Sequence, residues 1–295
     1  MLQNKGGIFP TVSVTENKVV LSVPGLEKSC RLFLIGDYHS TLSDEREIPF
    51  RKYSARMAQY GHHDMTMLEE FFRQAQSEKC DAILLLGDMI SFPSRAGVES
   101  LERLMKSSPV PCYFTAGNHD WHYEGTAGSD MEQRRQWINE RLKSLYQGRD
   151  PMNYAVEVNG LRILMMDNSV YEILPSQLAF LENELARGAN TLIACHIPFH
   201  LPGTDRSVTS YGCGHPRWGE ASDPYYEIEQ RQPWAKEGLS QTAFDFCSRV
   251  LSAENVLGIV AGHTHRFMTD VFSNKIQLVV SSQKAAVLEL KNLSR

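Results

Sequence analysis

The sequence predicts an α/β fold with mixed β-sheets, and three observations support this prediction. Five short apolar runs are bounded by glycine, polar or turn residues, a pattern typical of strands buried on both faces. Segments with the spacing of amphipathic helices lie between several of the runs. Asn159-Gly160 joins two further apolar segments, and this dipeptide signals a hairpin of antiparallel strands. The five runs cover residues 30–35, 82–86, 112–116, 192–195 and 256–261.

Local patterns justify the other elements in chain order. A hairpin is expected first, because alternating segments 11–14 and 19–23 flank a turn. Helical spacing then covers residues 68–75 and 98–105. A capping box at residues 129–132 opens a helix that is expected to continue through about Tyr146. The remaining expected elements are hairpin strands 154–158 and 161–166, a helix over 175–187 closed by Gly188, and final strands 276–280 and 286–290.

Each of the five apolar runs leads into a motif with side chains that bind metal. If the strands lie side by side, their carboxyl ends face a common crevice, which is where such sheets hold ligands. We therefore expect these side chains to converge on one place. The candidate ligands are Asp37, His39, Asp88, Asn118, His196, His263 and His265.

The chemistry of this set predicts a centre of two metal ions. Oxygen and imidazole ligands together suit Mn, Fe or Zn better than Ca²⁺, which prefers oxygen alone, or Cu(I), which prefers sulfur. Seven ligands exceed what one tetrahedral ion needs but fit two ions if a carboxylate is shared, and Asp88 is the candidate bridge. Ions about 3.5–4 Å apart are the arrangement that supports in-line displacement at phosphorus. The identity of the metal stays open.

The order of the motifs resembles that of the calcineurin-like metallophosphoesterase superfamily. The blocks D-x-H, G-D, G-N-H-[D/E], a later His and G-H-x-H occur in the family's order from Asp37 to His265. The resemblance implies a four-layer α/β/β/α sandwich of two mixed sheets flanked by helices, in a single domain over residues 1–295. It also implies that strands 276–280 and 286–290 complete the second sheet.

The resemblance further implies a role for each residue of the site. His119 would be the catalytic histidine that is not a ligand, oriented by Asp120 or a nearby backbone group. Asn168 would support the ligands through hydrogen bonds, and Asp167 ends a strand at the same edge. Asp37, His39 and His265 are assigned to the first metal, Asn118, His196 and His263 to the second, and Asp88 to both.

The implied activity is hydrolysis of a small phosphomonoester or phosphodiester, possibly nucleotide-like, by a hydroxide that bridges the two metals. Whether the substrate is a monoester or a diester stays open. The second block ends in Ser91 where purple acid phosphatases carry tyrosine, so a tyrosinate-bound iron is not expected. The alternative is a catalytically silent binding scaffold on the same fold. Such relatives lose ligands or the catalytic histidine, whereas this chain retains all eight residues.

Substrate recognition is predicted to lie in one of two segments. Residues 200–238 are rich in aromatic residues and arginine without any periodicity, and a loop of that length is usually functional. We expect it to form a cap over the site, although a loop that merely packs on its own aromatics is the simpler alternative. The insertion at residues 40–63 is the second candidate. The candidate substrate-binding residues are His200, Arg206, Arg217, Trp218 and Arg56.

Composition narrows the partners. A net charge of −5 gives no global basic surface for duplex nucleic acid, so a small phosphoester is the expected partner. No stretch of about 18 apolar residues or signal segment is present, and membrane association is not expected. Six cysteines without a C-x-x-C pair lie mostly in apolar runs, which favours reduced thiols and a cytoplasmic location. The oligomeric state cannot be predicted.

Overall fold

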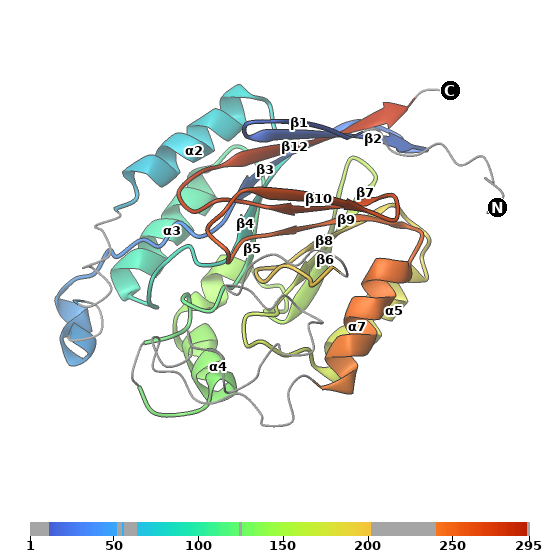
Figure 1. Ribbon diagram of the computed structural model, residues 1–295. Helices are drawn as coiled ribbons and strands as arrows, with labels where there is room; N and C mark the ends of the chain where they lie inside the picture. Colours follow the sequence, from blue (N-terminus) through green and yellow to red (C-terminus); the bar gives the residue numbers. More distant parts are fainter. Residues whose placement is uncertain (1–11, 52–54, 56–63, 124–125, 202–239, 294–295) are drawn as a thin grey trace.

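Two six-stranded sheets are stacked face to face with helices on their outer sides (Figure 1). The computed structural model describes residues 12–51, 55, 64–123, 126–201 and 240–293. Neighbouring residues of the central strands point to opposite faces of the second sheet. Met165 packs into the core between the sheets, whereas Met166 packs against the outer helices. The predicted four-layer α/β/β/α sandwich is therefore confirmed.

The first sheet has the order β1-β2-β12-β3-β4-β5. Strands β3, β4 and β5 run parallel, and every residue of β4 is buried, as its uninterrupted apolar sequence predicts. The predicted hairpin of β1 and β2 is confirmed. The bounds are β1 (Val12–Thr15), β2 (Lys18–Pro24), β3 (Cys30–Ile35), β4 (Ala82–Leu86), β5 (Cys112–Thr115) and β12 (Ala286–Leu293).

The second sheet has the order β10-β11-β9-β8-β7-β6. Strands β7, β8, β9 and β11 are parallel to one another, and β6 and β10 are antiparallel at the two edges. Asn159 and Gly160 both have positive φ, at 52° and 80°, which confirms the predicted hairpin turn. The bounds are β6 (Asn153–Val158), β7 (Leu161–Met166), β8 (Thr191–Ala194), β9 (Val256–Ala261), β10 (Met268–Phe272) and β11 (Lys275–Val279).

The helices begin and end where local signals place them. Ser94, Ser129 and Ser240 each accept a hydrogen bond from the first turn of a helix, and the capping box at Ser129 is complete. Apolar residues of α5 and α7 pack on the outer face of the second sheet. The bounds are α2 (Thr66–Ser77), α3 (Arg95–Ser107), α4 (Asp130–Glu140), α5 (Pro175–Leu185) and α7 (Gln241–Ser252), with 3₁₀ helices η1 (Glu45–Phe50) and η2 (Leu142–Tyr146).

The position of the last strand corrects one expectation. Strand β12 does not complete the second sheet but lies in the first, between β2 and β3, with Leu288 opposite both Val19 and Leu32. Only β11 joins the second sheet, where β10 covers its other edge. An apolar run shows that a strand is buried but not which neighbours it will have.

The helix expected to run through Tyr146 is also interrupted. The backbone leaves the helical conformation at Arg141, where φ is −135°, and continues as η2. The Arg141 guanidinium is buried against the carboxylate of Glu47, with Nη1 at 2.9 Å from both oxygens. This contact between distant segments explains why the helical pattern stops early.

Across the described ranges, the structure contains no helix that is long and apolar enough to cross a membrane. Cysteines 30, 80, 112, 195 and 247 are buried free thiols. Cys195 packs against α7 on the outer face of the second sheet, away from the neighbouring His196, as strand alternation predicts.

Candidate metal centre

The carboxyl ends of five parallel strands from the two sheets meet at one edge of the sandwich. Strands β3, β4 and β5 deliver their motifs from the first sheet, and β8 and β9 deliver theirs from the second. In three groups of side chains, all the potential ligand atoms lie within 4.8 Å of one another. The groups are Asp37, His39 and His265; His39, Asp88 and His119; and Asp88, His196 and His263.

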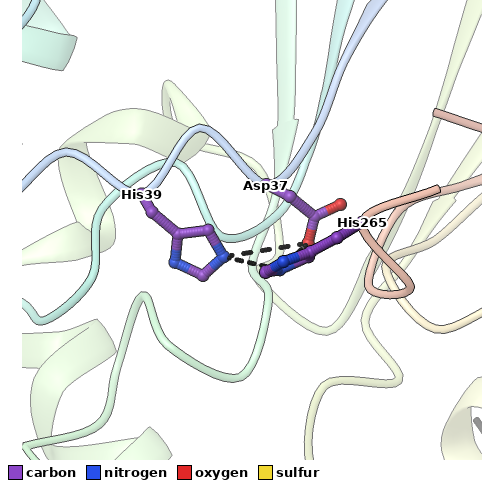
Figure 2. A group of neighbouring side chains, drawn as sticks. All are labelled: Asp37, His39 and His265. Atoms are coloured by element: carbon purple, nitrogen blue, oxygen red, sulfur yellow. Dashed lines mark hydrogen bonds and ion pairs between the residues drawn. The ribbon is translucent and has the colours of Figure 1, made fainter. Parts of the chain in front are cut away.

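The first group joins the ends of β3 and β9 (Figure 2). His39 Nε2 lies 3.0 Å from His265 Nε2, and Asp37 Oδ1 lies 3.5 Å from His265 Nε2 and 4.0 Å from His39 Nε2. Figure 2 shows the two rings pointing toward one another, with the carboxylate beside them. The three side chains therefore direct their ligand atoms at a common point.

The second group joins the ends of β5, β8 and β9. His196 Nε2 lies 3.0 Å from Asn118 Oδ1 and 3.2 Å from Asp88 Oδ2. His263 Nδ1 lies 3.1 Å from the same Asn118 oxygen. Asn118 thus belongs with this group, as its sequence position predicts.

Asp88 lies between the two groups. Its Oδ2 is 3.2 Å from His196 Nε2 and 3.8 Å from His39 Nε2, so one carboxylate oxygen faces ligands of both groups. Its Oδ1 accepts a hydrogen bond of 2.7 Å from the His119 backbone N–H. The carboxylate is almost completely buried and is fixed by the backbone of the neighbouring loop.

The arrangement fits two bound cations. Asp37 Oδ1 is buried and accepts no hydrogen bond within the described part of the chain, although imidazole nitrogens lie close to it. Buried carboxylates and imidazoles that converge without hydrogen-bonding partners are expected where a metal supplies the missing interaction. Nitrogen and oxygen donors in this proportion suit a transition metal such as Mn, Fe or Zn.

Burial and mutual charge strongly perturb the ionisation of these groups. Burial raises the pKa of Asp37 to about 7. Burial acts in the same direction on Asp88, but the nearby histidines outweigh it and hold the pKa of that carboxyl well below its usual range. Desolvation would lower the pKa of His196, yet Asp88 and Asp37 raise it to about 9, whereas burial keeps the pKa of His39 well below its usual value. Without a metal, the site therefore retains protons near neutral pH.

The backbone is strained at most of the ligands. Five of the seven have left-handed conformations, which side chains other than glycine, asparagine and aspartate seldom adopt. Such strain clusters at functional sites and persists only where the surrounding structure fixes it. The five φ angles are 52° at Asp37, 56° at His39, 53° at Asp88, 73° at His263 and 57° at His265.

Glycines at the motif ends allow the loops to approach closely. A Cβ at Gly117 would lie 2.2 Å from Asp88 Oδ1 and 2.4 Å from Asp88 N. Gly117→Ala is therefore expected to displace the Asp88 carboxylate and to lower metal content, measured by elemental analysis. Gly258→Ala is the control, because its Cβ would meet Ile276 O at 2.6 Å within the second sheet. Equal metal loss in the two variants would show that general destabilisation, and not the position of Asp88, explains the effect.

Hydrogen bonds across the two sheets hold the ligands in place. His196 Nδ1 lies 2.9 Å from the carbonyl of Leu86 at the end of β4, and this contact directs Nε2 toward the site. Asp37 Oδ2 accepts a hydrogen bond of 2.7 Å from His263 N. Each sheet therefore fixes a ligand that belongs to the other.

Asp120 and Asn168 support the loops that carry the ligands. The Asp120 carboxylate accepts hydrogen bonds from the backbone N–H groups of residues 88, 90 and 117, at 2.7 to 3.0 Å. Asn168 Oδ1 accepts from the N–H groups of His196 and Ile197. Asp120 thus contacts the backbone around Asp88, and its hydrogen bonds do not include the His119 ring.

The predicted substrate residues are mostly outside the described ranges. His200 is half-buried and follows the His196 motif. Ser91, in the place of a tyrosine ligand, donates a hydrogen bond to the carbonyl of His39. Arg56, Arg206, Arg217 and Trp218 lie outside the described residues, as does most of the expected cap.

Sequence reasoning did not identify every residue that supports the site. Arg134 and Ser169 are almost completely buried near the strand ends but occur in no motif. Arg134 lies in a helix whose polar sequence gives no sign that its guanidinium is buried. The Trp121 side chain, which is fully buried two residues after His119, was also not singled out.

Comparison with curated proteins gives two similar relatives. A probable cyclic nucleotide phosphodiesterase of Psychrobacter sp. (strain PRwf-1) is 25% identical over 215 residues, which cover 70% of this chain and 54% of the relative. A probable cyclic nucleotide phosphodiesterase of Psychrobacter arcticus is 22% identical over 212 residues, which cover 68% of this chain and 63% of the relative. The chain spans less than two thirds of the length of either protein.

Solved structures share the fold. A dimetal phosphatase from Danio rerio has a TM-score of 0.51 and 14% identity, with 86% of this chain and 88% of that chain covered. A purple acid phosphatase from yellow lupin seeds has a TM-score of 0.51 and 13% identity, with 90% of this chain and 46% of that chain covered. The family model for calcineurin-like phosphoesterases matches residues 30–267, a range that includes all seven candidate ligands. The chain therefore belongs to the calcineurin-like phosphoesterase family.

Proposed function

We propose that this protein is a metal-dependent phosphoester hydrolase with a centre of two ions. The observation that carries the proposal is the position of Asp88, whose Oδ2 faces His39 of one ligand group and His196 of the other. A carboxylate shared in this way is what a pair of closely spaced ions requires. The proposal assigns Asp37, His39, Asp88 and His265 to the first ion and Asp88, Asn118, His196 and His263 to the second.

His119 is proposed as the residue that acts on the leaving group. Its ring lies edge-on to that of His39, with centroids 4.8 Å apart, and its backbone N–H is fixed by Asp88. Bound ions would supply the positive charge that binds phosphoryl oxygens and lowers the pKa of water. His119 would donate a proton to the departing oxygen, as general acids do in hydrolysis. Asp120 would position the 88–90 backbone around this site.

Cyclic nucleotides are the first substrate class that we propose. The names of the two Psychrobacter relatives support this choice, since both are called probable cyclic nucleotide phosphodiesterases. A small diester also agrees with the acidic charge of the chain, which does not favour a duplex nucleic acid. His200 is the one proposed substrate contact that lies within the described residues.

A hydrolysis panel with added Mn²⁺ tests the proposal. The panel compares an aryl phosphodiester, a cyclic nucleotide, an aryl phosphate monoester and a sugar phosphate, and elemental analysis gives the metal content. We expect two ions per chain and faster turnover of the diesters. Faster turnover of the monoesters would reject the substrate class while keeping the hydrolase. Two bound ions without turnover of any substrate would instead support the catalytically silent scaffold.

Metal uptake is expected to depend on pH. A proton competes with the metal at His196, whose pKa in the metal-free protein is about 9, and at Asp37, whose pKa is about 7. Both values are raised, so the protons are held below these values and lost as pH rises through them. Affinity for Mn²⁺ should therefore increase between about pH 6 and 9, with protons released on binding. Calorimetry in buffers of different ionisation enthalpy measures this release, and a constant affinity over that range would contradict the expectation.

A further inference from the structure

A buried ion pair lies beside the metal centre but includes no metal ligand. Arg134 on α4 donates a hydrogen bond of 2.8 Å from Nε to Asp167 Oδ2 at the end of β7. The two side chains are only 6% and 0% exposed. Removing two charges from water is unfavourable unless their hydrogen bonds are satisfied, so the other contacts of this pair are informative.

The pair continues through hydrogen bonds into the loop that carries Asn118. Asp167 Oδ1 accepts hydrogen bonds from the Ser169 hydroxyl at 2.5 Å and from the Ser169 backbone N–H at 2.9 Å. The same hydroxyl accepts a hydrogen bond of 2.8 Å from Trp121 Nε1. Because the hydroxyl donates to a carboxylate and accepts from an indole, both contacts are satisfied at once. We call Arg134, Asp167, Ser169 and Trp121 the indole network.

The residue between Asp167 and Ser169 connects the same segment to the second sheet. Asn168 Oδ1 accepts hydrogen bonds from His196 N at 3.2 Å and from Ile197 N at 3.0 Å. Residues 167–169 therefore contact both the β5 loop, through Trp121, and the β8 loop, through Asn168. These loops provide Asn118 and His196, whose ligand atoms are 3.0 Å apart.

We propose that the indole network positions Asn118 relative to His196 and thereby sets the affinity of the second metal position. The inference rests on the proposed two-ion centre. Trp121 is a positioning residue, because it acts through the backbone of its own loop and not through contact with the ion. A charge-assisted hydrogen bond from Ser169 to Asp167 holds the hydroxyl in the orientation that accepts from the indole.

The effect should be confined to the second position. The first position depends on contacts that do not involve residues 167–169. Asp37 N donates to the carbonyl of Gly87, His39 N donates to that of Asp88, and Asp37 Oδ2 accepts from His263 N. Loss of the indole hydrogen bond leaves these contacts in place. A selective change in one of two affinities is a readout that general destabilisation would not produce.

The experiment titrates metal-free protein with MnCl₂ and measures the two affinities by calorimetry and the bound ion by electron paramagnetic resonance. The variants are Trp121→Phe, Ser169→Ala and the double variant. The control is Trp137→Phe, because Trp137 is also buried but takes part in none of these hydrogen bonds. Thermal unfolding of each metal-free protein shows whether the variant is folded, and Ser169→Ala serves if Trp121→Phe does not fold.

We expect Trp121→Phe and Ser169→Ala each to weaken the second Mn²⁺ by about tenfold, the lower end of the effect of groups that support metal ligands. The first Mn²⁺ should bind as in the wild type, and so should both ions in Trp137→Phe. The double variant should be no weaker than either single variant, because both changes break the same hydrogen bond.

Wild-type affinity at both positions in folded Ser169→Ala would overturn the inference while leaving the proposed function intact. Equal weakening at both positions, or losses that add in the double variant, would also overturn it. Wild-type protein that binds fewer than two Mn²⁺ ions would instead contradict the proposed function, together with the inference that rests on it.

Discussion

Asp88→Asn is expected to abolish most of the activity and to weaken the binding of both metals. A neutral amide cannot bridge two cations as a carboxylate does, and Asp88 Oδ2 faces ligands of both groups. The loss should exceed the factor of about 10–100 that follows when a hydrogen-bonding partner of a ligand is removed. Elemental analysis and calorimetric titration with MnCl₂ measure both affinities, alongside turnover of an aryl phosphodiester.

Asp81→Asn is the matched control for this prediction. Asp81 precedes β4 whereas Asp88 follows it, so the same substitution is made at opposite ends of one strand. Asp81 Oδ2 accepts a hydrogen bond from Arg31 N and has no part in the ligand groups. Asp81→Asn should retain both ions. Full occupancy with normal turnover in Asp88→Asn would refute the assignment of the bridge.

His119→Ala should leave both metals bound while it lowers kcat by about 10²–10⁴-fold, the range for a lost general acid. The ring is half-buried beside His39, and the proposed ligand set is complete without it. A substrate with an acidic aryl leaving group should lose least, because that group departs without a proton. An alkyl ester should lose most.

The ratio of the two losses decides the role of His119. Steady-state kinetics on matched aryl and alkyl phosphodiesters, with metal content measured on the same samples, gives this ratio. An equal loss on both substrates would reject the general-acid role and leave His119 as a residue that binds phosphate. Loss of an ion from His119→Ala would mean that the third group, with His39 and Asp88, contains a true ligand.

The strands and the ligands were predictable because both depend on local sequence. Each central strand is apolar along its whole length, and the residues that follow it have nowhere to lie except at the sheet edge. The pattern does not include long-range pairing, and for this reason β12 was placed in the wrong sheet. Strand β10 was missed because it lies at an edge, where residues such as Val271 are exposed and the apolar signal is weak.

The support of the site was less predictable than the ligands themselves. Asn168 was expected to form hydrogen bonds there, but the partners of Asp120 and the burial of Arg134 depend on how separate elements pack. Arg141 ends α4 through its contact with Glu47, and no spacing rule joins residues so far apart. The substrate contacts proposed at Arg56, Arg206, Arg217 and Trp218 stay predictions, since they lie outside the described residues.

The position of β12 affects the order in which the two halves of the centre can form during synthesis. Strand β3, which leads to Asp37 and His39, has β4 on one edge and β12 on the other. Strands β6 to β11 all precede β12 in the chain and can pair among themselves first. Closing the pairing between β3 and β12 spans most of the described chain, and contacts of such high sequence separation form slowly. On the ribosome, His196, His263 and His265 would therefore be placed in a finished sheet while β3 still has an open edge.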